Sequence, residues 1–161
     1  MNEILELLEK DARYTPKQLS AMTGEPQEKV EEYIAAAEAD GTLLGYSAIV
    51  DWEKAGKSDD SVTALIEVKI APQRGDGFDR IAERIYQYEE VESLFLMSGS
   101  FDLAVLITGR TMKDVSRFVF ASLAPIEGVT ATATHFIMKK YKEKHRIFEK
   151  QEEQKDRLLF V

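Results

Sequence analysis

Apolar residues follow two different periods along this chain, and the change of period divides the sequence. Up to Gly41 they recur three or four positions apart, as in an amphipathic helix. From Val62 onward, runs that alternate as strands do are interleaved with further helical stretches. Residues 51–61, D-W-E-K-A-G-K-S-D-D-S, follow neither period. We therefore expect a helical unit at 1–50, a linker at 51–61, a mixed unit at 62–140 and a charged extension at 141–161.

Three short helices are predicted in the first unit. Thr15 followed by Pro16 is typical of an N-cap with proline in the first helical turn. A third helix begins at Pro26 and ends at Gly41, a frequent C-terminal stop. Short helices joined by tight turns form a helix-turn-helix. Residues 43–50 are rich in Leu, Tyr, Ile and Val, and we expect a small strand or wing there.

The mixed unit has the element order β-α-β-β-α-β. The predicted elements are a strand at 62–70, a helix at 78–85, two apolar runs between 91 and 109, a helix at 115–123 and a strand at 129–138. This order is that of the ferredoxin-like split unit, whose first and third strands are central in the sheet. The fold class expected for the chain is therefore α+β, with a winged helix-turn-helix before a ferredoxin-like unit.

The run Leu103–Ile107 has no polar position, so as a strand it needs cover on both faces. One layer of helices covers only one face of a sheet, and the other face then calls for a second subunit. We expect a homodimer with Leu103 and Val105 at its interface. The polar turn Ser98–Asp102 would lie at the rim of that interface, a suitable place for a small molecule.

Charge is distributed unevenly along the chain. Of its 161 residues, 44% are hydrophobic and 31% charged, which is ordinary for a globular protein. Residues 1–60 contain six basic and fourteen acidic side chains, whereas residues 61–161 contain fifteen of each. No apolar stretch approaches the roughly 20 residues that a spanning helix needs, and the chain begins with acidic residues, so we expect a cytoplasmic protein without membrane contact. The lack of cysteine excludes disulfides, thiolate zinc sites and a cysteine nucleophile.

Four motifs in this order carry a family resemblance: Glu38-x-x-Gly41, Gly45-Tyr46-Ser47-Ala48-Ile49-Val50-Asp51, Gly99-x-Phe101-Asp102 and Val129-x-x-Thr132-x-Thr134. With them the chain resembles the Lrp/AsnC, or feast/famine, regulators. The resemblance implies transcription regulators that bind double-stranded DNA, dimerise, often form octamers, and bind amino acids or similar effectors near the turn between the second and third strands. It implies an effector site at Ser98, Gly99, Ser100, Asp102, Thr132 and Thr134.

Each of those residues also has a structural explanation. Asp102 is suited to accept a charge-assisted hydrogen bond from an effector's ammonium group. Alternatively, Gly99 and Asp102 only shape a hairpin turn, and the two threonines reflect strand propensity.

The helix-turn-helix departs from the family pattern in charge. Candidate DNA contacts are Thr15, Lys17, Gln18, Gln27, Lys29 and Tyr33. Where the family carries serine and then basic residues, this chain has Pro26, Glu31, Glu32 and Tyr33. Because affinity for phosphates depends on cations, we expect weak, salt-sensitive binding that multivalency strengthens. The alternative is an amino-acid sensor, or a protein that modulates a partner, without DNA binding. The basic run 139–146 is either a phosphate contact, an intersubunit arm or a solvated tail.

Catalytic motifs are lacking. His135 and His145 are the only histidines, and neither a Ser-His-Asp set, a P-loop nor a dinucleotide motif occurs. We expect no metal, no cofactor and no enzymatic activity. Sirohaem decarboxylases have the same two-unit architecture and use histidine, so His135 leaves that alternative open.

Overall fold

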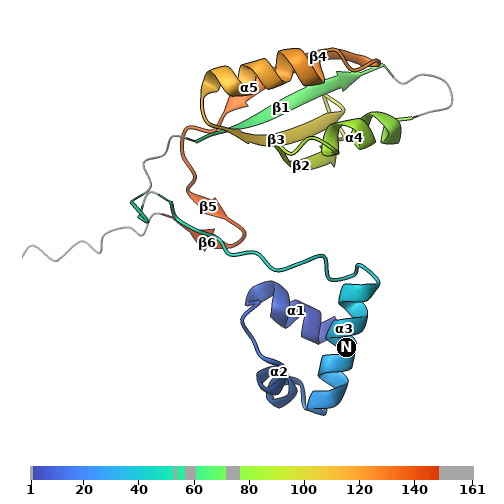
Figure 1. The fold of residues 1–161 in the computed structure, drawn as a ribbon, viewed down its shortest axis with the longest axis vertical. Coiled ribbons are helices and arrows are strands. Elements are labelled where there is room, and N and C mark those ends of the chain that lie inside the picture. Colours follow the sequence, from blue (N-terminus) through green and yellow to red (C-terminus); the bar gives the residue numbers. More distant parts are fainter. Residues whose placement is uncertain (1, 53, 57–60, 72–76, 149–161) are drawn as a thin grey trace, which may run out of the picture. The chain divides into compact units, whose positions relative to one another are not determined.

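The computed structural model describes residues 2–52, 54–56, 61–71 and 77–148 (Figure 1). The chain divides into two units, Met1–Val50 and Asp51–Val161. Residues 53 and 57–60 of the predicted linker and 149–161 of the predicted extension lie outside the described residues. No helix in the described part of the chain is long and apolar enough to cross a membrane.

The first unit consists of three helices, α1 (Asn2–Lys10), α2 (Pro16–Thr23) and α3 (Gln27–Ala39). Each helix contributes to one apolar core, whose buried members are Ile4, Leu8, Leu19 and Val30. Gly24 ends α2 in the left-handed conformation, with a φ of +75° that glycine adopts without steric cost. The predicted helix-turn-helix is confirmed.

The predicted wing is absent. Residues 43–50 contain no strand, and Leu44 is 94% exposed. A strand needs another strand to satisfy its backbone donors and acceptors. The helices are the only regular elements among the described residues of this unit, so nothing there can pair with residues 43–50.

The second unit contains one antiparallel sheet with the strand order β2-β3-β1-β4. Its elements are β1 (Val62–Ile70), α4 (Asp79–Tyr86), β2 (Val91–Leu96), β3 (Leu103–Gly109), α5 (Met112–Phe118), the π-helical continuation η1 (Val119–Leu123) and β4 (Val129–Phe136). The central strands are β1 and β3, as predicted for a ferredoxin-like unit. The fold class is therefore confirmed as α+β, with a helix-turn-helix before a ferredoxin-like unit, apart from the wing.

Both helical segments pack on the same face of this sheet and form its core (Figure 1). On that face the register pairs Ile66 with Val105 and Val68 with Leu103. Ile85 of α4 and Val115 of α5 belong to the same buried cluster.

Leu103 and Val105 are consequently no more than 1% exposed within their own chain. This corrects the residues predicted at the dimer interface, because their side chains fill the core of the subunit that carries them.

The other face of the sheet has no cover among the described residues. Register places Leu65 opposite Leu106 of β3 and His135 of β4, and Glu67 opposite Ala104 and Ala133. We call this surface the open face. The apolar runs correctly predicted that helices would cover only one face of the sheet. The side chains on the uncovered face, however, are the neighbours of Leu103 and Val105 along the strand and not these two residues.

A two-stranded hairpin follows the sheet, formed by β5 (Lys142–Glu143) and β6 (Arg146–Ile147). Figure 1 shows it apart from the four-stranded sheet. Its two connecting residues, Lys144 and His145, have φ values of 42° and 66°.

Candidate effector and DNA-binding sites

The turn between β2 and β3 is fastened to the end of β1 by Asp102. The backbone N–H of Asp102 donates to the carbonyl of Val68 at 3.0 Å, and its own carbonyl accepts from the N–H of Met97 at 2.8 Å. One carboxylate oxygen, Oδ2, accepts from the N–H of Ile70 at 2.7 Å. The β1–β4 register shifts between Lys69 and Ile70, so the carboxylate stabilises an irregular point of the sheet. Asp102 therefore has a structural role in this turn.

Three other predicted effector residues, Ser98, Gly99 and Ser100, are exposed on the same turn. The φ of Gly99 is +158°, and apart from Gly99 and its two chain neighbours no atom lies within 4 Å of where a Cβ would stand. The turn is thus open to an incoming molecule on this side.

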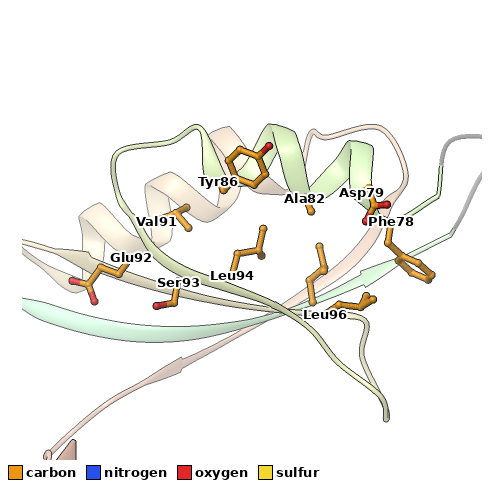
Figure 2. Close-up of a pocket in the computed structure, with 10 residues that line it drawn as sticks. Phe78, Asp79, Ala82, Tyr86, Val91, Glu92, Ser93, Leu94 and Leu96 are labelled. Atoms are coloured by element: carbon orange, nitrogen blue, oxygen red, sulfur yellow. The ribbon is translucent and has the colours of Figure 1, made fainter. Parts of the chain in front are cut away.

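A hollow of about 430 Å³ lies between α4 and β2, next to this turn (Figure 2). This volume falls within the range of small-molecule sites. The hollow is lined by Phe78, Asp79, Ala82, Tyr86, Val91, Glu92, Ser93, Leu94, Leu96 and Leu103. Leu96 and Leu103 are cross-strand partners that flank the turn, so the hollow ends where the turn begins. Figure 2 shows Leu94 and Leu96 directed from β2 toward α4.

The sequence did not point to this hollow. Phe78, Ala82 and Tyr86 are four positions apart and form one stripe that runs from the N-cap residue Phe78 along α4, beside the buried Ile81 and Ile85. A stripe of this kind, next to the stripe that faces the core, could have indicated one wall of a ligand site. The opposite wall is the edge strand β2, and the sequence does not show that β2 lies beside α4 until the strand order is known.

The last two predicted effector residues lie elsewhere. Thr132 and Thr134 are on β4, opposite Val68 and Ile66 of β1. They are half-buried on the helix-covered face, and β4 is at the other edge of the sheet from β2. Within the described residues of one chain, the six predicted residues therefore do not line a common pocket.

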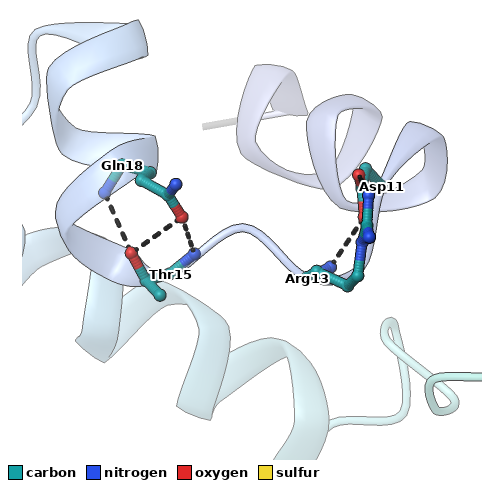
Figure 3. Close-up of polar contacts among 4 residues, drawn as sticks. All are labelled: Asp11, Arg13, Thr15 and Gln18. Atoms are coloured by element: carbon teal, nitrogen blue, oxygen red, sulfur yellow. Dashed lines mark hydrogen bonds and ion pairs between the residues drawn. The ribbon is translucent and has the colours of Figure 1, made fainter.

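Two of the predicted DNA contacts bind each other in a capping box at the start of α2 (Figure 3). The N–H of Gln18 donates to Oγ1 of Thr15 at 3.3 Å. In return, Oε1 of Gln18 accepts from the N–H of Thr15 at 2.9 Å. These side chains satisfy backbone groups that the helix leaves unpaired.

On α3, Gln27 and Tyr33 also have structural partners. Nε2 of Gln27 donates to Oε1 of Glu31 at 2.7 Å, and Tyr33 packs against the helical core. Lys17 and Lys29 are exposed, and they are the cations among the six predicted contacts.

Arg13 is an exposed cation that the sequence analysis missed. Its Nε and Nη2 donate to the two carboxylate oxygens of Asp11 at 2.9 and 2.7 Å (Figure 3). The hydrogen bonds to Asp11 raise the pKa of Arg13 above its ordinary value. Its side chain is 90% exposed.

Carboxylates dominate the surface of α3 and its flank. Glu28, Glu31, Glu32 and Glu38 are all exposed. The hydroxyl of Tyr46 donates to Oε1 of Glu38 at 2.9 Å. The pKa of Tyr46 is raised, mainly because the hydroxyl is partly buried and secondly because of this hydrogen bond. Hydrogen bonds from Thr42 lower the pKa of Asp40 at the end of the helix. The electrostatics here are those of a negative surface with few cations.

His135 lies on the open face and not in a pocket. Its Nε2 is 3.2 Å from Oε1 of Glu67 on the neighbouring strand. Among the described residues, no group of three or more His, Cys, Asp or Glu side chains could hold a metal ion.

The fold and the hollow together define a class of protein: a helix-turn-helix followed by a ferredoxin-like unit with a cavity of ligand size. Residues 63–147 match the Lrp/AsnC ligand binding domain. The chain is 46% identical over 147 residues to the uncharacterized HTH-type transcriptional regulator YugG of Bacillus subtilis, covering 91% of this chain and 88% of that protein. The chain therefore belongs to the Lrp/AsnC family of ligand-responsive transcriptional regulators, and the resemblance found in the sequence is confirmed.

Solved structures with the same fold include two that contain L-methionine. The regulator NMB0573 of Neisseria meningitidis, in complex with L-Met, has a TM-score of 0.66 at 24% identity, covering 87% of this chain and 88% of that one. The feast or famine regulatory protein Rv3291c of M. tuberculosis, complexed with L-methionine, has a TM-score of 0.67 at 20% identity, covering 91% and 95%.

Proposed function

We propose that this protein is a DNA-binding regulator whose sheet unit senses an amino acid at the hollow between α4 and β2. The observation that carries the proposal is the position of this hollow, which ends at the β2–β3 turn. The presence of L-methionine in two structures of the same fold supports an amino acid as the effector.

The hollow and the turn offer complementary chemistry for such a molecule. Phe78, Leu94 and Leu96 give an apolar surface for an aliphatic side chain. Carboxylates at Asp79 and Glu92 in the hollow, and at Asp102 beside it, suit an ammonium group, because hydrogen bonds between charged groups are stronger than neutral ones. The backbone amides around Gly99 suit a carboxylate, since glycine allows close approach.

DNA binding in this proposal depends on few cations in the helix-turn-helix, namely Arg13, Lys17 and Lys29. A homodimer formed through the open face would carry two such units, and multivalency would compensate for weak binding by each. Assembly into an octamer would extend the same effect.

The test is a titration of fluorescent DNA from the region upstream of the protein's own gene, followed by anisotropy. We expect binding at about 50 mM salt that weakens strongly by about 200 mM, as counterion release requires. L-methionine or another of the twenty amino acids should change the affinity by at least about fivefold, the lower range of ordinary allosteric coupling. DNA binding that no amino acid alters would contradict the sensing half of the proposal.

A second candidate function is an amino-acid sensor that does not bind DNA. It is favoured by the charge of the first unit, whose residues 1–50 contain four basic and ten acidic side chains, a net charge of −6. No binding to DNA at low salt, with amino-acid binding retained, would decide for this candidate.

We propose no catalytic role for the chain. His135 faces Glu67 on the open sheet face rather than a cavity, which gives little support to a tetrapyrrole decarboxylase. Purified protein with tetrapyrrole absorbance in the visible range would revive that alternative.

A further inference from the structure

The β5–β6 hairpin and the residues just before it concentrate positive charge in a chain that is otherwise strongly acidic. Residues 139–146 contain five basic side chains and one acidic one, a net charge of +4, while the whole chain has −8. The remainder therefore carries −12. All five cations are exposed, namely Lys139, Lys140, Lys142, Lys144 and Arg146. Such a local excess is the electrostatic signature of a polyanion contact.

The two residues in the turn of this hairpin are unusual for their backbone conformation. Lys144 and His145 both adopt positive φ, at 42° and 66°, between the paired residues Glu143 and Arg146. Two-residue turns with this backbone favour Asn-Gly or Gly-Gly, because a side chain is strained there. A lysine and a histidine at these positions place an ammonium group and an imidazole ring at the tip, at a conformational cost. Strain of this kind points to a requirement for the side chains themselves.

The hairpin is attached to the start of the second unit. Nζ of Lys54 donates to the carbonyl of Phe148 at 2.8 Å and pairs with Oδ2 of Asp51 at 3.0 Å. The N–H of Phe148 in turn donates to the carbonyl of Tyr141 at 3.0 Å. The β5–β6 hairpin is thus held against Lys54, which follows the end of the helix-turn-helix unit at Val50 by four positions (Figure 1).

We propose that the β5–β6 hairpin binds the phosphate backbone of duplex DNA and supplies the positive charge that the acidic helix-turn-helix lacks. This inference rests on the proposed DNA-binding function. A two-stranded ribbon fits the grooves of DNA, and its lysines would release counterions without reading the sequence. Nζ of Lys140 lies 3.5 Å from Oε2 of Glu143, an exposed pair that phosphate would readily displace.

The test compares salt dependence in two variants of the full chain with equal charge. One, the hairpin variant, carries Lys142→Gln and Lys144→Gln on the hairpin and Lys140→Gln just before it. The control carries Arg84→Gln, Arg110→Gln and Lys113→Gln, three exposed cations outside the hairpin. Each phosphate contact contributes about 0.9 to the slope of log affinity against log salt. The hairpin variant should show a slope shallower by about 2.7 per bound subunit, whereas the control keeps the wild-type slope.

A third variant, with arginine at the same three hairpin positions, separates charge from folding and should restore the wild-type slope. Circular dichroism and size-exclusion chromatography of each variant report on its fold. An unchanged slope in the folded glutamine hairpin variant would overturn the inference and leave the proposed function in place. An equal loss in the control would also overturn it, since net charge alone would then explain the effect. Failure of the wild-type protein to bind DNA at low salt would overturn both.

Discussion

At the scale of single residues, Asp102 shows how one carboxylate combines a structural task with a candidate binding task. Its Oδ2 holds the N–H of Ile70 at 2.7 Å, where the sheet register shifts. Sequence analysis left open whether Asp102 shapes the turn or binds an effector, because the partner is 32 positions away in the chain. The structural task is now assigned, and the binding task remains a prediction.

Two substitutions separate these tasks. Asp102→Asn keeps an oxygen acceptor for the Ile70 amide but removes the negative charge, so the protein should fold and lose affinity for whichever amino acid alters its DNA binding. Hydrogen bonds to charged groups contribute about 1.5–3 kcal/mol, which corresponds to a roughly ten- to hundredfold weaker Kd. Asp102→Ala leaves the amide without an acceptor and should also lower stability by about 1–3 kcal/mol. Calorimetric titration and urea unfolding measure the two effects. Wild-type affinity in Asp102→Asn would exclude the carboxylate from effector binding.

At the scale of helices and strands, the elements predicted well are those whose signals are local. Thr15, Pro16 and Gly24 mark the ends of α2 within a few residues of the hydrogen bonds they make. The strand or wing at 43–50 was predicted from side-chain preference alone, and preference cannot supply a pairing partner. The hollow was missed for a related reason, because it needs α4 and β2 to be neighbours.

The capping box of α2 gives a prediction at this scale. Thr15→Ala removes the side-chain acceptor for the Gln18 amide and should lower the free energy of unfolding of the helical unit by about 1 kcal/mol. Thr15→Ser is the matched control, since its hydroxyl keeps the bond. Urea unfolding followed by circular dichroism of the full chain measures the difference. If Thr15→Ala matched the stability of Thr15→Ser, the capping role would be wrong.

At the scale of the whole molecule, the sequence correctly implied that one sheet face lacks cover but assigned it the wrong side chains. Successive residues of a strand point to opposite faces, so an entirely apolar strand does not reveal which set faces its own helices. Packing of α4 and α5 decides this, by burying Leu103 and Val105 and leaving Leu65 and Leu106 on the open face.

The assignment of the open face predicts different outcomes for two substitutions that look alike in the sequence. Leu65→Asp places a charge on the open face beside Glu67. In the proposed dimer two like-charged sheets would then have to meet, so this variant should be a folded monomer. Leu103→Asp places the same charge in the core and should unfold the sheet unit. Phe120→Asp, at a residue 81% exposed on η1, is the control that should remain a folded dimer. Light scattering after size exclusion, with circular dichroism, distinguishes the three. A stable dimer of Leu65→Asp would mean that the subunits associate through a surface other than the open face. That other surface would then hold the two helix-turn-helix units together.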